Sequence, residues 1–309
     1  MNLQRVITAS FAALNRAPLL GALWAEELFF TPRRGPLSPR VREFLATGRR
    51  RDLLLEEGTR IATWEWGAGP TVALVHGWAG VGGQLAAFAP PLLAAGFRVV
   101  TFDAPGHGAA GGRRSSLVHF ARALRAAVGP DGSAHAVIAH SLGAAAATLA
   151  MAQGLSIRRA VFIGATAGPR DWTAQFARRF GIADRVMARL RRRTEQRLGL
   201  RWEDLDVVPT ARRRCEPLLV IHDRHDAEVP WSDGAAIAEA WPGAELVTTA
   251  GLGHRRILRD AAVVERSVAF VAETAVTAGG SEAASGCPRT HPSPSRRPPT
   301  DRHLLLLPA

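Results

Sequence analysis

The stretch Ala136-Val137-Ile138-Ala139-His140-Ser141-Leu142-Gly143-Ala144-Ala145-Ala146-Ala147 decides how this chain folds. An apolar run typical of a strand ends at Ser141, and an alanine-rich run typical of a helix begins at the next residue. A serine at a sharp strand-to-helix turn, with small residues two positions before and after it, is the pattern of a nucleophile elbow. Ala139 stands where the usual pattern has glycine, and Gly143 matches it. The same letters also fit an ordinary turn whose serine caps a helix, so the rest of the chain must decide.

The composition is that of a globular protein. The chain has 309 residues and a hydrophobic content of 47%, which is enough for one large domain with a sizeable core. Two cysteines, Cys215 and Cys287, are too few for a disulfide framework. No grouping of histidine and cysteine has the spacing of a zinc site, so we expect no metal.

The net charge of +12 is carried by three segments of the chain, and the remainder is close to neutral. Every basic residue is an arginine. The net charge is +5 over residues 1–52, +6 over 166–213, +2 over 278–309 and −1 over the remainder. A neutral core and the uniform use of arginine indicate a compositional bias rather than a surface for nucleic acid, so we expect no nucleic-acid partner.

Residues 1–52 are predicted to form an N-terminal helical extension. Their apolar part is shorter than the ~20 residues that a membrane span needs, because charged residues and a proline interrupt it. These are Arg5, Arg16, Pro18, Glu26 and Glu27. No convincing signal-peptide cleavage site follows. We expect a cytoplasmic protein whose N-terminal helix packs on the domain, which is the commoner outcome, or contacts a membrane surface.

Strand and helix patterns alternate over residues 53–165 and 214–277. Apolar runs predict strands at 71–75, 97–102, 136–140, 160–164 and 218–221, and those at 71–75 and 97–102 are expected to be buried on both faces. A further strand is predicted at 245–249. A hairpin is predicted from 53–55 and 61–66, and helices from 84–95, 117–128, 233–241 and 257–274. The alternation indicates an α/β fold with a mostly parallel sheet of about eight strands and helices on both faces.

Two further segments do not show this alternation of strand and helix patterns. Residues 166–213 are rich in arginine and helical in pattern, and their position predicts a small helical lid. Residues 278–309 are rich in Gly, Ser, Pro and Arg without periodicity, which predicts a disordered tail.

These residues together resemble the α/β-hydrolase superfamily, in particular its small serine esterase and lipase-like members. The resemblance covers residues 53–277 except the lid. It rests on five landmarks in this order: His76-Gly77-Trp78, Asp103-Ala104-Pro105-Gly106-His107-Gly108, the elbow at Ser141, Asp226 and His254. Serine, aspartate and histidine follow one another as in the superfamily. Each of the three comes shortly after a predicted strand, where ligands bind in open α/β sheets.

The resemblance implies a catalytic triad. Ser141 would be the nucleophile, which needs a base because a hydroxyl attacks poorly at its own pKa. His254 would be that base, and Asp226 would orient it and stabilise the imidazolium. Asp223 competes with Asp226 for the acid role. The superfamily's Asp-x-x-Asp-x-x-Val-Pro pattern favours the second aspartate.

The resemblance also implies an oxyanion hole and a substrate pocket. The backbone N–H groups of Trp78 and Leu142 would stabilise the oxyanion. The candidate substrate-binding residues are His76, Gly77, His140, Trp172 and Phe176. Among these, His76 is expected to shape the oxyanion loop and His140 to be structural rather than catalytic. Trp172 or Phe176 is expected to line an acyl pocket.

We therefore expect a serine hydrolase that cleaves a carboxylic ester or related acyl bond of a small molecule, without any cofactor. A serine at the elbow argues against epoxide hydrolases and dehalogenases, which need a carboxylate there. Two alternatives stay open. One is an acyltransferase or carbon–carbon hydrolase that uses the same triad. The other is a catalytically idle relative that binds a partner or a membrane surface.

Overall fold

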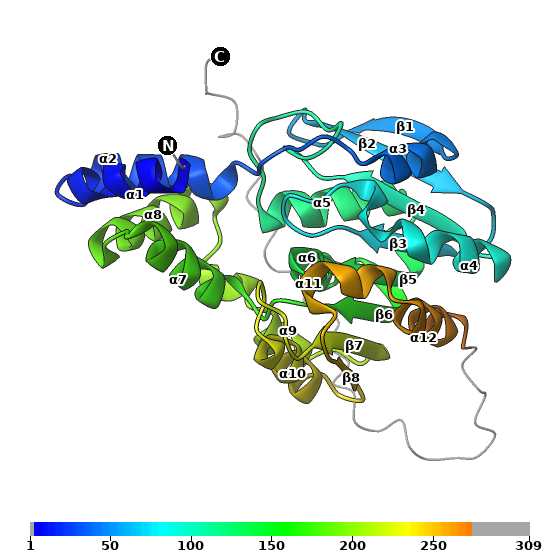
Figure 1. Ribbon diagram of the computed structural model, residues 1–309. Helices are drawn as coiled ribbons and strands as arrows, with labels where there is room; N and C mark the ends of the chain where they lie inside the picture. Colours follow the sequence, from blue (N-terminus) through cyan, green and yellow to red (C-terminus); the bar gives the residue numbers. More distant parts are fainter. Residues whose placement is uncertain (1–2, 274–309) are drawn as a thin grey trace, which may run out of the picture.

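A computed structural model describes residues 3–273 of the chain, and an eight-stranded sheet lies at its centre (Figure 1). The strands are Arg49–Leu54 (β1), Arg60–Trp66 (β2), Thr71–Val75 (β3), Arg98–Asp103 (β4), Ser133–His140 (β5), Ser156–Ile163 (β6), Leu218–Asp223 (β7) and Glu245–Thr249 (β8). Their order across the sheet is β1-β2-β4-β3-β5-β6-β7-β8. Strand β2 is antiparallel to β1 and β4, and the other neighbours are parallel. The predicted fold class is confirmed, and the tail expected at 278–309 lies outside the described residues.

Helices cover both faces of the sheet. One face packs against α5 (Leu117–Val128), α6 (Leu142–Ala152), α9 (Val207–Ala211) and α10 (Trp231–Ala240). The other packs against α3 (Pro39–Ala46), η1 (Gly82–Phe88), α4 (Ala89–Ala94), η3 (Ile257–Arg259) and α12 (Ala261–Ala272). Val137 belongs to the first core and its neighbour Ile138 to the second. Because successive side chains point to opposite faces, a strand covered on both sides must be apolar throughout.

The helix expected at 84–95 consists of two parts. Residues Gly82–Phe88 form a 3₁₀ helix, and α4 follows with Pro90 and Pro91 in its first turn. Proline has no backbone N–H to donate and clashes inside a helix, but it is tolerated in a first turn. The prolines therefore begin a new helix instead of continuing the first.

The N-terminal helices and the insertion form one unit. Helices α1 (Leu3–Leu14) and α2 (Pro18–Phe30) pack against α7 (Pro169–Phe180) and α8 (Asp184–Leu198), to the left of the sheet in Figure 1. Residues Trp202–Leu205 (η2) join them, and we call this unit the helical cap. The segments expected as a separate extension and lid are thus parts of one structure. Helix α9 packs on the sheet core instead, and β1 begins at Arg49, so both segments are shorter than 1–52 and 166–213.

A buried carboxylate links the cap to the sheet domain. Glu26 on α2 is only 5% exposed and makes ion pairs with three arginines. These are Arg114, which precedes α5, and Arg193 and Arg197 on α8. Burial raises the pKa of Glu26, but the hydrogen bonds and charges of the arginines outweigh it and hold that pKa below its ordinary value. The cluster therefore keeps the charged Glu26 of α2 buried with partners on two other segments, α8 and the residues before α5.

Candidate active site

Ser141 lies at a strained turn between β5 and α6. Its backbone has φ 55° and ψ −124°, and it is one of two non-glycine residues in 3–273 with positive φ. Gly143 explains the need for a small residue, since a Cβ there would lie 2.7 Å from the His76 carbonyl oxygen and 2.8 Å from that of Val75. Ala139 is fully buried, so its methyl is accommodated. This is the backbone geometry of a nucleophile elbow, held by its surroundings at a cost in strain.

A cavity of about 490 Å³ opens beside this turn. Its lining includes Gly77, Trp78, His140, Ser141, Leu142, Trp172 and His254. Ser141 is partly exposed, and its hydroxyl has no hydrogen-bond partner within residues 3–273. The side chain is therefore available to a molecule in the cavity.

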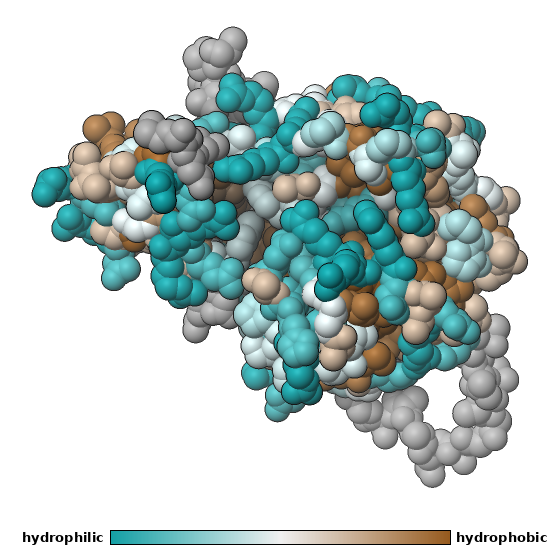
Figure 2. All heavy atoms as spheres, viewed as in Figure 1, coloured by the Kyte–Doolittle hydropathy of each residue, from teal (hydrophilic) through white to brown (hydrophobic). Residues whose placement is uncertain are grey.

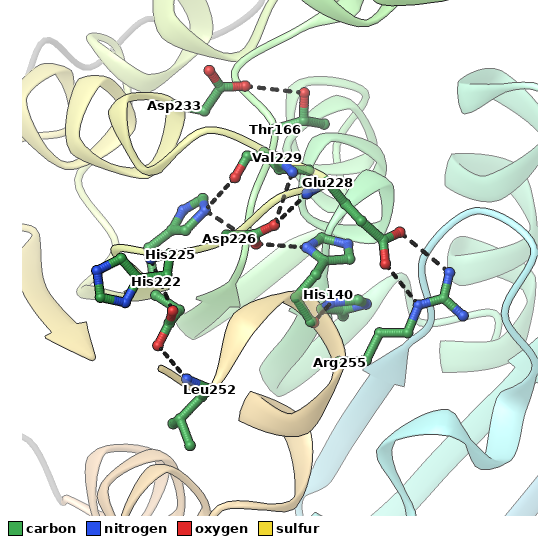
Figure 3. Close-up of polar contacts among 12 residues, drawn as sticks. His140, Thr166, His222, His225, Asp226, Glu228, Val229, Asp233, Leu252 and Arg255 are labelled. Carbon is green, nitrogen blue, oxygen red and sulfur yellow. Dashed lines mark hydrogen bonds and ion pairs between the residues drawn. The ribbon is translucent and has the colours of Figure 1, made fainter. Parts of the chain in front are cut away.

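Asp226, in the loop after β7, meets His254 in the short helix α11 (Gly253–Arg256) after β8. His254 Nδ1 lies 2.7 Å from Asp226 Oδ2. The Glu228 and Val229 N–H groups donate to Asp226 Oδ1 at 2.8 and 2.9 Å (Figure 3). Burial raises the pKa of Asp226, but these bonds and the contact with His222 outweigh it and keep the pKa well below its ordinary value. An ionised Asp226 only accepts, so His254 Nδ1 carries the proton and Nε2 is its basic nitrogen.

Gly164 lies close to the hydrogen bond between Asp226 and His254. Gly164 follows β6 with φ +55°, and a Cβ there would lie 3.2 Å from His254 Nδ1 and 3.4 Å from Asp226 Oδ2. A side chain at this position would therefore press on the hydrogen bond between them.

Asp223 has a different task. Its carboxylate accepts from the N–H groups of His225 and Leu252 and from the Thr249 hydroxyl at 2.8 to 2.9 Å. Burial raises the pKa of Asp223, but these hydrogen bonds lower it to about 2. It thus fixes the loop that leads to His254, and among the two rival aspartates only Asp226 bonds the histidine.

The N–H groups on both sides of Trp78, in the loop after β3, have acceptors within the protein. The Gly77 N–H donates to Gln84 Oε1 at 3.0 Å, the Ala79 N–H to His107 Nε2 at 3.1 Å and the Gly80 N–H to the Gly77 carbonyl at 3.0 Å. The Trp78 N–H has no acceptor in the described part of the chain. Leu142 is the first residue of α6, a position whose N–H has no acceptor in its own helix. Both donors are thus free to bind an anionic atom in the cavity.

Three buried histidines brace these loops as neutral rings. Burial lowers the pKa of His76 to about 4 and that of His107 to about 3. It also lowers the pKa of His140 to about 3, with the neighbouring His254 acting in the same direction. His76 Nδ1 donates to the Gly77 carbonyl at 2.7 Å, and His76 Nε2 accepts from the Ala104 N–H at 3.1 Å. His140 Nε2 donates to the His254 carbonyl at 2.9 Å.

Two of the five candidate substrate-binding residues, His76 and Phe176, do not line the cavity. Gly77, His140 and Trp172 line the cavity. His76 is fully buried with both ring nitrogens engaged and does not line it, because the ring lies behind the loop that it braces. Phe176 also lies away from the cavity, since α7 turns this ring toward Phe29 and Phe180 in the cap, with centroids 5.1 and 5.3 Å away.

Several other residues lie at the site, although no sequence pattern predicts them there. Residues 35–38 and Arg40 and Val41 form one wall of the cavity. Phe29 and Phe30, from the end of α2, reach the neighbourhood of Leu142. Nothing local marks these residues, because they reach the site only through the packing of the cap. No group of three or more His, Cys, Asp or Glu side chains within 3–273 is arranged to hold a metal ion.

Comparison with known proteins identifies the family. A model of the alpha/beta hydrolase family matches residues 72–266, well over half of the chain. The chain therefore belongs to the alpha/beta hydrolase family. No curated protein matches it in sequence.

Solved structures share the fold at low identity. The esterase RhEst1 from Rhodococcus sp. ECU1013 is 19% identical with a TM-score of 0.53, and the match covers 72% of this chain and 98% of that one. The esterase EaEST from Exiguobacterium antarcticum is 14% identical with a TM-score of 0.55, covering 73% and 100%. Alpha/beta hydrolase domain-containing protein 10 from mouse is 15% identical with a TM-score of 0.57, covering 72% and 96%. Identities this low establish a shared fold and no shared substrate.

Proposed function

We propose that this protein is a serine hydrolase that cleaves a carboxylic ester or a related acyl bond. One observation carries the proposal: His254, which is hydrogen-bonded to Asp226, borders the same cavity as Ser141 at its strained turn. The nucleophile follows β5, the orienting acid follows β7 and the base follows β8, all in the same half of the sheet. The two N–H donors beside Ser141 add the remaining element that acyl transfer needs.

The reaction proceeds through an acyl-enzyme. The Ser141 oxygen attacks the carbonyl carbon while His254 Nε2 takes the hydroxyl proton. The Leu142 and Trp78 N–H groups stabilise the negative oxygen of the tetrahedral intermediate. The bond to the leaving alcohol then breaks, and His254 returns the proton to the alcohol oxygen. Water repeats the sequence on the acyl-enzyme and releases the acid and free Ser141.

Hydrolysis of p-nitrophenyl acetate tests this proposal. We expect Ser141→Ala and His254→Ala each to lower kcat by about 10⁴-fold or more. Ser156→Ala serves as the control, because this serine is exposed at the start of β6. Full activity of folded Ser141→Ala would contradict the proposal. No activity in any form would favour the idle relative, and acyl transfer to added alcohol in preference to water would favour an acyltransferase.

We also propose that the outer face of α1 and α2 contacts an anionic membrane surface. Five of the seven large exposed hydrophobic residues within 3–273 lie there: Val6, Leu19, Leu20, Leu23 and Trp24. Figure 2 shows apolar residues over this end of the molecule, with hydrophilic ones around them.

Arginines border this face. Arg179 bonds Gln4 Oε1 and Arg185 bonds the Asn15 carbonyl, so arginines of α7 and α8 flank both ends of α1. An apolar face bordered by arginine suits a surface of anionic lipid, to which each basic residue adds attraction. No helix within residues 3–273 is long and apolar enough to cross a membrane, so the contact would be superficial.

Vesicle sedimentation tests the membrane contact. We expect the protein to bind vesicles with phosphatidylglycerol, to bind less at high salt, and not to bind pure phosphatidylcholine. The double variant Leu20→Glu with Leu23→Glu should lose binding. Leu54→Glu, an exposed leucine on β1, should keep it. Equal binding by the double variant would contradict the proposal, and a dimer that only this variant abolishes would assign the face to a second copy.

A further inference from the structure

A small apolar pouch adjoins the cavity, with which it shares lining residues. Its walls include Phe29 of α2, Leu117 of α5, Leu142 and Ala145 of α6, and Trp172 and Leu205 of the cap. Its volume is about 40 Å³. The pouch therefore lies between the sheet domain and the cap, and α2 supplies one wall.

The pouch adjoins the proposed reaction centre. It shares Trp78, Leu142, Thr166 and Trp172 with the large cavity. Leu142 directly follows Ser141, and its N–H is one of the two proposed oxyanion donors. A carbonyl carbon bound at Ser141 thus lies in the cavity of about 490 Å³, beside a residue that also lines the pouch.

The size of the pouch sets what fits in it. A group the size of one water needs about 10–15 Å³ in this measure of volume, so 40 Å³ admits about three such groups. Apolar walls favour methyl and methylene groups, because a polar group would lose its hydrogen bonds to water there.

We propose that this pouch binds the acyl chain of the substrate and limits it to a short one, of about two to four carbons. The larger cavity then takes the leaving alcohol. This inference rests on the proposed hydrolysis at Ser141. It makes the N-terminal helix α2 part of the specificity site.

The wall contributed by α2 is held firmly. The ring of Phe29 contacts those of Trp172 and Trp202, with centroids 4.8 and 6.1 Å away, and Trp172 contacts Trp78 at 5.7 Å. Its neighbour Phe30 lies under the guanidinium groups of Arg114 and Arg197, which both bind Glu26. Because these contacts tie the wall to the cap and the sheet domain, the pouch cannot widen without breaking several of them.

A series of p-nitrophenyl esters with the same leaving group tests the inference. We expect kcat/KM to peak at acetate or butanoate and to fall by about tenfold or more at octanoate. Leu205→Ala and Phe29→Leu enlarge the pouch and should raise the octanoate-to-butanoate ratio. Leu205→Phe narrows it and should lower the butanoate-to-acetate ratio. Leu93→Ala removes a partly buried leucine of the other core and should leave both ratios unchanged.

The outcomes separate this inference from the function on which it rests. A wild-type optimum at octanoate, or ratios that Leu205→Ala and Leu205→Phe leave unchanged, would overturn the acyl pouch while Ser141-dependent hydrolysis stands. Absence of hydrolysis, together with no reaction of Ser141 with a fluorophosphonate, would overturn both.

Discussion

His140 Nε2 donates a hydrogen bond to the carbonyl oxygen of His254 at 2.9 Å, and the two rings lie with centroids 4.4 Å apart. The residue directly before the proposed nucleophile therefore holds the backbone of the proposed base. A carbonyl only accepts, so His140 carries its proton on Nε2. Its pKa, lowered to about 3 chiefly by burial, keeps it neutral at physiological pH. The bond ties the loop after β8 to the turn after β5.

Loss of this bond should impair catalysis more than binding. We expect His140→Ala to lower kcat by about 10²-fold with a small change in KM, because a displacement of about 1 Å in the base has an effect of that size. His140→Gln, whose side-chain amide can donate to the same carbonyl, should recover part of the loss. An unchanged kcat in folded His140→Ala would show that His254 needs no such support.

The two aspartates after β7 should differ in their effects. Asp226→Asn should lower kcat by about 10³–10⁴-fold, because the imidazolium loses its partner and the tautomer changes. Asp223→Asn should mainly lower the free energy of unfolding, by about 1–3 kcal/mol, because its carboxylate accepts bonds from three groups of the loop. Steady-state kinetics and urea denaturation of both variants check this. The reverse pattern would assign the orienting role to Asp223.

Much of this constellation could be predicted from the sequence, because its signals are local. Ser141 and Gly143 mark the turn by residue type, and Asp226 and His254 each follow a predicted strand. In a parallel sheet the carboxyl ends of neighbouring strands lie at one edge, so these residues had to meet.

The cap could not be predicted in the same way. Glu26 binds Arg197 across 171 positions of sequence, and Phe29 reaches Trp172 across the same boundary between segments. Helix α2 is apolar on all sides, which indicates burial or a contact surface but no particular partner. For this reason the sequence does not predict that the extension and the lid form one unit, or that Phe29 and Phe30 lie near the site.

The cap should depend on its buried carboxylate. We expect Glu26→Gln to lower the free energy of unfolding by up to about 3–5 kcal/mol, since three arginines lose their shared partner; their partial exposure to water lessens the effect. Glu27→Gln is the matched control, because Glu27 is more exposed and its contact with Arg114 is 3.9 Å long. Urea denaturation measures both. Equal stability of the two variants would show that the cluster contributes little.

The buried histidines should make the protein less stable in acid. His76, His107 and His140 have folded pKa values of about 4, 3 and 3, below the ordinary 6.5 that they regain on unfolding. Between these values the unfolded chain binds more protons, so the free energy of unfolding falls as the pH drops from about 6.5 toward 4. The lowered pKa of Asp223 acts in the same direction only below its ordinary 3.8. Urea denaturation at pH 7.5, 6 and 5 checks this, and a stability that rises over this range as the pH falls would contradict it.

The activated serine is the central claim, and its reaction with a fluorophosphonate tests it most directly. Intact-mass analysis and peptide mapping after reaction should find one adduct per chain, on Ser141. The adduct should form far more slowly in His254→Ala and not at all at this position in Ser141→Ala. A folded protein that stays unmodified, or that carries the adduct on another residue, would contradict the account.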